Sequence, residues 1–98
     1  MDITKAQNAD GTTFKISGRL DTLTAPEAEK AVMAEALPSK LVFDLGDLEY
    51  ISSAGLRVLL SVHKKMLAGG GTMTVTGCNE TVMDILETTG LSTVLNIE

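Results

Sequence analysis

The stretch from Leu41 to Leu60 constrains the fold of this chain most strongly, because the spacing of its apolar residues changes part-way along. Residues 41–45 form a short apolar run broken only by Asp44, which is typical of a strand buried on both faces. The turn sequence Ser-Ser-Ala-Gly follows at residues 52–55. Beyond it the apolar spacing is helical, and the inner face is expected to hold Leu56, Leu59, Leu60, His63, Met66 and Leu67.

The remaining segments alternate between strand and helix patterns. Residues 3–6 and 12–17 predict an antiparallel hairpin, joined by the turn sequence Asn8-Ala-Asp-Gly11. The further elements expected are helices at about 25–36, 53–67 and 80–88, a strand at 73–76, and a final short strand within residues 91–97, around 94–95. Because alternating strands and helices form parallel, right-handed crossovers, the expected fold class is α/β. Its sheet would have about four or five mostly parallel strands, an antiparallel hairpin strand at one edge, and about three helices mainly on one face.

Capping residues predict where the helices begin and end. Thr24 and Glu27 match a capping box, in which a hydroxyl and a carboxylate bond free backbone N–H groups at the helix start. The first helix would then present a stripe of small side chains to the sheet, namely Ala28, Ala31, Val32 and Ala36. Glycines 69–71 are expected to end the second helix, and Asn79 is expected to cap the third.

Composition limits the class of partner. With 98 residues, of which 44% are hydrophobic, the chain is expected to form a single domain over residues 1–98 with an extensive core. A net charge of −5 disfavours nucleic acid and anionic membrane surfaces, both of which need basic residues. No apolar run is long enough for membrane insertion, and the single cysteine, Cys78, fits a reducing compartment. We therefore expect a cytoplasmic protein that binds another protein or a small ligand.

Sequence signatures of catalysis are missing. The chain has no phosphate-binding loop and no dinucleotide-binding fingerprint. Its one histidine, His63, should lie roughly 15 Å from Ser53 along the helix axis, at about 1.5 Å per residue, which argues against a catalytic triad. Cys78 is expected to be a small buried filler. We therefore expect no enzyme activity, no catalytic residue, no cofactor and no metal site.

The serine turn has two interpretations. In the first, Ser53 is only a favoured helix cap, and Gly55 only allows close packing. In the second, the helix N-terminus is an anion site, whose free N–H groups and dipole would stabilise a phosphate on Ser53. Such a phosphate would add about −1.5 to −2 charges at neutral pH. It would repel a partner docked over the turn while the fold stayed intact.

Residues 43–60, FDLGDLEYISSAGLRVLL, resemble the signature of the STAS domain, and more narrowly that of the bacterial anti-sigma factor antagonists. The resemblance covers the whole chain. Gly18-Arg-Leu-Asp21 is similar to the family's Gly-x-Leu/Ile-Asp after the second strand. Glycines 69–71 before a strand, and Thr89-Gly-Leu91 after the third helix, are similar to further features of the family.

The resemblance implies a mechanism as well as a fold. Antagonists of this family bind an ATP-dependent serine kinase that also acts as the anti-sigma factor. Phosphorylation breaks that binding, and a metal-dependent serine phosphatase restores it. The family's phosphorylated serine falls on Ser53, while Ser52 stands where the antagonists usually have aspartate and is a competing acceptor. The implied docking surface, with Asp21 at the same end of the sheet as Ser53, contains Asp21, Ser52, Ser53, Gly55, Leu56 and Arg57.

Several alternatives stay open at the level of sequence. Asp21 is equally expected as an ordinary turn residue. Val58 and Val62 flank the apolar stripe, where they either form an exposed patch for a partner or widen the core face. For the function, one alternative is a non-phosphorylated STAS module, such as the accessory subunit of a lipid-transport ABC system. Another is a small-ligand module, although the missing phosphate-binding loop counts against it.

Overall fold

Strands and helices alternate along the chain in the predicted order, with two short elements added. The computed structural model describes residues 1–9, 11–34 and 36–98, so Asp10 of the expected turn and Glu35 of the expected first helix lie outside the described residues. The elements are β1 (Asp2–Asn8), β2 (Gly11–Leu20), α1 (Ala25–Met33), β3 (Lys40–Asp44), β4 (Leu48–Ile51), α2 (Ser53–Ala68), β5 (Thr72–Thr76), α3 (Glu80–Thr88), the 3₁₀ helix η1 (Leu91–Thr93) and β6 (Asn96–Ile97). Neither β4 nor η1 was predicted from the sequence.

The sheet confirms the expected combination of an antiparallel hairpin with parallel crossovers. Its strand order is β1-β2-β3-β5-β6, with β4 pairing β2 off this path, which gives six strands where fewer were expected. β1 and β2 are antiparallel, with Ile3 opposite Ile16, and the other described pairs are parallel. Because parallel neighbours cannot be joined by a tight turn, the chain passes through α1, α2 and α3 between them.

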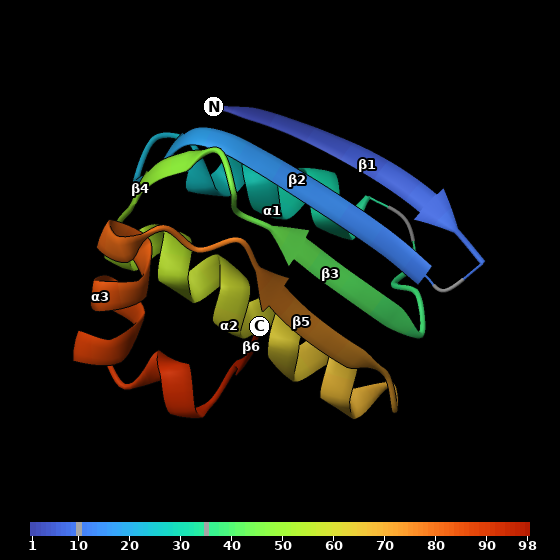
Figure 1. Cartoon of the computed structure of the whole chain (residues 1–98). Coiled ribbons are helices and arrows are strands. Elements are labelled where there is room, and N and C mark those ends of the chain that lie inside the picture. Colours follow the sequence, from blue (N-terminus) through green and yellow to red (C-terminus); the bar gives the residue numbers. More distant parts are fainter. Residues whose placement is uncertain (10, 35) are drawn as a thin grey trace.

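The helices lie mainly on one side of the sheet, as predicted. α1 and α2 cover one face, and the other face has no described helix over it (Figure 1). The side chains of β3 alternate accordingly, because Leu41 and Phe43 are buried whereas Val42 and Asp44 are only half-buried. The expectation that this strand is buried on both faces is therefore wrong, since its second face lies toward solvent.

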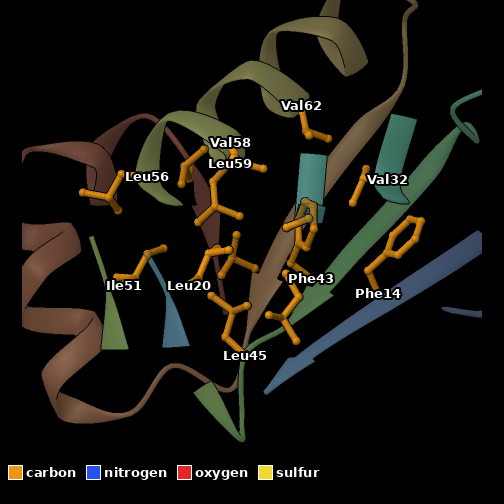
Figure 2. Close-up of a cluster of buried hydrophobic side chains, with 14 of the residues drawn as sticks. Phe14, Leu20, Val32, Phe43, Leu45, Ile51, Leu56, Val58, Leu59 and Val62 are labelled. Carbon is orange, nitrogen blue, oxygen red and sulfur yellow. The ribbon is translucent and has the colours of Figure 1, made fainter. Parts of the chain in front are cut away.

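The inner face of α2 is rotated relative to the one that the apolar spacing predicts. Figure 2 shows Val58, Leu59 and Val62 between α2 and the strands, in the same cluster as Phe43. Leu67, expected inside, is 61% exposed. The two valines therefore belong to the core and not to an exposed flank. The buried residues of this helix are Gly55, Leu56, Val58, Leu59, Val62 and Met66.

The start of α1 differs from the predicted capping box. The Thr24 side chain bonds no N–H group of the helix. Its hydroxyl instead accepts from the Asp21 N–H at 2.9 Å and donates to the Arg19 carbonyl at 2.9 Å. The hydroxyl is thus engaged by the preceding loop and is not available as a cap. The helix also ends early, at Met33, so Ala36 of the predicted stripe lies outside it and is exposed.

The C-terminal part contains one confirmed cap and one misplaced strand. The Asn79 side chain accepts from the Val82 N–H at 2.8 Å, and so caps α3 as predicted. Its amide also donates to the Leu48 carbonyl at 2.8 Å, which ties the start of α3 to β4. The last strand, β6, lies within the expected range 91–97 but after its expected centre at 94–95, because the chain first turns through η1 after Gly90, whose φ is +79°.

Candidate functional site

β2 and β4 run parallel and finish at the same end of the sheet. Leu20 lies opposite Ile51, and the Ser52 N–H donates to the Leu20 carbonyl at 2.9 Å. The loop that begins at Asp21 and the turn that holds Ser53 therefore emerge side by side, at the shared end of the sheet expected for these two residues. β4 makes this arrangement possible. This strand was not predicted from the sequence, because only its two end residues are buried and its side chains do not alternate between buried and exposed.

Ser52, and not Ser53, caps α2. Ser52 has an extended backbone (φ −95°, ψ 176°), and its hydroxyl oxygen accepts a hydrogen bond from the Gly55 N–H at 3.4 Å. The interpretation of Ser53 as the cap is wrong, because the chain is still extended at Ser52 as it leaves β4. Ser53 is the first helical residue. Its side chain is exposed, and its hydroxyl has no hydrogen bond within the described residues.

The N-terminal end of α2 differs in charge from those of its neighbours. Its first turn contains no acidic residue, whereas the first turn of α1 contains Glu27 and that of α3 contains Glu80. Free N–H groups and the helix dipole make such an end positive. An anion attached to Ser53 would therefore meet a positive helix end with no carboxylate in its own first turn.

Two of the predicted docking residues lie beneath the surface. Gly55 is buried, and a Cβ atom there would lie 2.7 Å from Ile51 Cγ1 and 2.8 Å from the Leu20 carbonyl oxygen. Leu56 is 6% exposed and belongs to the core. Burial corrects the expectation that these two residues form part of the contact surface. They hold α2 against β2 and β4, and so fix the position of Ser53.

Asp21 organises the loop between β2 and α1. Its carboxylate accepts from the Leu23 N–H at 3.0 Å and from the Thr24 N–H at 3.2 Å, and the Arg19 guanidinium lies 3.7 Å away. The hydrogen bond from the Thr24 N–H is the main cause that lowers the pKa of Asp21 below its ordinary value. These are the contacts of a turn residue, which is the alternative that the sequence left open.

A leucine at this end of the sheet was missed by the sequence analysis. Leu23, in the loop that Asp21 holds, is 88% exposed. A single exposed leucine is ordinary on a protein surface, but this one follows the strand that ends beside Ser53. The available clue was its position between two threonines, outside any helical or strand spacing. Arg57 is also exposed, one helical turn beyond Ser53.

Groups suited to other chemistry are dispersed. Within the described residues, no set of at least three His, Cys, Asp or Glu side chains could hold a metal ion. Cys78 is half-buried against the core, and burial raises the pKa of its thiol. His63 Nδ1 is buried and has no hydrogen-bond partner in the described part of the chain. None of the described helices has the length and apolar character of a membrane span.

Comparison with known proteins assigns the chain to a family. The family model described as the STAS domain matches residues 1–98. This chain belongs to the STAS domain family. The resemblance of its serine turn to the STAS signature is thereby confirmed, together with the α/β fold that the resemblance implied.

Relatives of this STAS protein carry the names of regulatory binding proteins. The candidate anti-sigma factor antagonist BtrV of Bordetella bronchiseptica is 35% identical over 71 residues, which cover 72% of this chain and 61% of that protein. The anti-sigma-B factor antagonist of Bacillus subtilis is 28% identical over 92 residues, covering 93% of this chain and 84% of that protein. The crystal structure of an anti-sigma factor antagonist from Mycobacterium paratuberculosis has a TM-score of 0.88 at 26% identity, covering 98% of this chain and 83% of that one.

Proposed function

We propose that this chain is an anti-sigma factor antagonist, and that a phosphate on Ser53 switches off its capture of a serine kinase/anti-sigma factor. The observation that carries the proposal is the exposed Ser53 hydroxyl, which stands at a helix end with no acidic residue in its first turn. The names of the STAS relatives support the regulatory role.

The surroundings of the two serines favour Ser53 over Ser52 as the acceptor. The Ser52 hydroxyl is half-buried and already accepts the Gly55 N–H bond that caps α2. Phosphorylation there would disturb the cap that starts the helix. The Ser53 hydroxyl has no such contact within the described residues, so it can be modified without breaking an interaction of the fold.

The charge on the phosphate supplies the switch. A phosphoserine carries about −1.5 to −2 charges at neutral pH. At Ser53 this charge would be stabilised by the end of α2 and would leave the core unchanged. A partner seated over the Asp21 loop and the serine turn would instead face a new negative group, and would be displaced by repulsion and by lost contact.

In this proposal the chain supplies the acceptor, and its partners supply the chemistry. The kinase transfers the γ-phosphoryl group of ATP to Ser53 Oγ, releasing ADP and taking up the hydroxyl proton. A metal-dependent serine phosphatase hydrolyses the ester with water, which returns the hydroxyl and releases inorganic phosphate. No catalytic residue, cofactor or metal of this chain takes part in either step.

The proposal is tested by incubating the chain with the kinase and ATP, locating the phosphate by mass spectrometry, and measuring kinase binding before and after. We expect one phosphate, on Ser53, and loss of binding. Ser53→Ala should bind the kinase and stay unmodified, whereas the control Ser52→Ala should still be phosphorylated. An unmodified Ser53 with normal kinase binding would remove the switch. Co-purification with a transporter ATPase and not with a soluble kinase would favour the accessory-subunit role.

A further inference from the structure

A groove runs between α1 and α2 and opens beside the serine turn. The two helices lie next to each other under the sheet (Figure 1), and the hollow between them has a volume of about 510 Å³. Ala54, the residue after Ser53, lines one end together with Thr22 of the Asp21 loop. Glu29 and Lys64 line it further along the two helices. The groove is therefore continuous with the candidate site.

The lining of the groove combines apolar side chains with a basic rim. Val58 and Ala25 are buried, and Leu60 is half-buried. Arg57 and Lys64 stand exposed along the α2 side, and neither forms an ion pair within the described residues. Against these two cations the lining has one carboxylate, that of the exposed Glu29 on α1, so the groove keeps a net positive lining on a chain whose net charge is −5. This charge pattern selects a partner that is apolar on one side and acidic beside it.

The spacing of the two cations indicates the shape of that partner. Arg57 and Lys64 are seven residues apart, which is close to two helical turns and about 10.5 Å along α2 at about 1.5 Å per residue. Carboxylates seven residues apart on a second helix repeat the same spacing on one face. Amphipathic helices that lie in apolar grooves are a common mode of protein recognition.

We propose that the α1–α2 groove binds an amphipathic helix of the kinase/anti-sigma partner. The apolar face of that helix packs over the half-buried Ala54 and Leu60, and two acidic residues seven positions apart pair with Arg57 and Lys64. This inference rests on the proposed function, and it extends the docking surface away from the serine turn. It also links the groove to the switch, because Arg57 lies four residues after Ser53, within reach of a phosphate there.

Charge reversal at two adjacent lysines tests the groove. Lys64 lines it, whereas Lys65 does not, and both side chains are exposed on α2. Titration calorimetry of the unphosphorylated chain with the kinase should give a Kd at least about tenfold weaker for Lys64→Glu, because a like charge then faces the partner's carboxylate. Lys65→Glu should stay within about twofold of the parent. Circular dichroism checks that both variants are folded.

A photo-crosslinking residue identifies the partner segment directly. Placed at Ser61 in the groove, it should capture a helical peptide of the kinase with two acidic residues seven positions apart. Thr72, exposed on β5 away from the groove, is the control position. Equal affinities of the two lysine variants, or capture of a segment without the acidic pair, would overturn the groove and leave the proposed function standing. Failure of the unmodified parent chain to bind the kinase would overturn both.

Discussion

The N-termini of α2 and α3 are built alike and charged differently. Each follows an extended residue whose side chain accepts a hydrogen bond from the N–H group three residues on, Ser52 in α2 and Asn79 in α3. In α3 the cap is reinforced by a second bond to the Leu48 carbonyl, and Glu80 lies in the first turn. In α2 the cap bond is longer, no acidic residue follows, and an exposed serine occupies the first helical position.

The difference suggests a division between a structural helix end and one kept free for regulation. α3 has its compensating carboxylate built in, so its positive end is already satisfied. α2 has no acidic residue in its first turn, and in the proposed switch a negative group is added there and removed again. The position of α2 does not depend on a carboxylate in its first turn, because Gly55 and Leu56 pack into the core and hold the helix in place. The predictions below test this contrast, beginning with the packing that both ends depend on.

The largest effect is expected at the third helical position, which is Gly55 in α2 and the buried Val82 in α3. In Gly55→Ala the new methyl would lie within 2.9 Å of atoms of Ile51 and Leu20, so α2 must shift. We expect the free energy of unfolding, measured with urea, to fall by about 1–3 kcal/mol. The control is Gly69→Ala, where the new methyl would lie 3.6 Å from the Lys65 carbonyl oxygen, and the free energy of unfolding should change by no more than about 0.5 kcal/mol. Equal stabilities of the two variants would show that α2 is not held by close packing.

Removal of the two caps should reveal their unequal strength. Asn79→Ala deletes two hydrogen bonds of 2.8 Å and should lower the free energy of unfolding by about 1–2 kcal/mol. Ser52→Ala deletes a single bond of 3.4 Å, and the loss should be about 0.5–1 kcal/mol. Urea unfolding of both variants shows which substitution lowers the free energy of unfolding more. A larger loss for Ser52→Ala would reverse the contrast between the two ends.

Charge changes in the first turn give a smaller effect of opposite sign at the two ends. Ser53→Asp adds a carboxylate to the uncompensated end of α2 and should stabilise the fold by about 0.3–1 kcal/mol at low salt. Glu80→Gln removes the carboxylate of α3 and should destabilise it by a similar amount of about 0.3–1 kcal/mol. Thermal unfolding at low and high salt separates these two charge effects from packing, since salt screens the charge effect at each helix end. Destabilisation by Ser53→Asp would contradict an anion-accepting helix end.

The smallest effect concerns the loop that faces the serine turn. The pKa of Asp21 is lowered in the folded chain, chiefly by the Thr24 N–H, so the folded state binds fewer protons than the unfolded state. Its contribution to stability is therefore present above the ordinary value of 3.8 and is lost as pH falls through the folded pKa. Between about pH 5 and pH 3, the urea concentration at the midpoint of unfolding should fall less for Asp21→Asn than for the parent chain. An unchanged pH profile would mean that the loop does not depend on this charge.

The sequence predicted those parts of the fold that depend on local pattern. The hairpin, the parallel crossovers and the Asn79 cap each follow from neighbouring residues and their spacing. The errors arise where two local solutions are nearly equal and tertiary contacts decide between them. The Thr24 hydroxyl can bond either the helix or the preceding loop, and in the structure it bonds Asp21 and Arg19 of the loop. The face of α2 that packs inward depends on how the helix lies on the sheet. As a result, Val62 is buried and Leu67 is exposed.

Some features of the candidate site could likewise be predicted from the sequence, and others depend on tertiary contacts. The position of the Asp21 loop at the same end of the sheet as the serine turn was expected, whereas the pairing of β2 with β4 that produces it was not. The choice of Ser52 as the cap depends on where β4 ends, and β4 itself was too short to recognise. The α1–α2 groove could not be predicted, because no spacing rule gives the distance between two helices that are joined only through strands. For Leu23 the only clue was its position between two threonines. Burial likewise removed Gly55 and Leu56 from the contact surface.

The most direct test of the account compares two forms of the same chain, unmodified and phosphorylated on Ser53 alone. Kinase affinity and the free energy of unfolding are measured on both preparations. The account predicts that kinase affinity falls at least about tenfold, as expected for a like-charge clash in an interface. It also predicts that the free energy of unfolding is unchanged or rises. Equal affinity of the two forms, or loss of binding accompanied by unfolding of the phosphorylated chain, would contradict it.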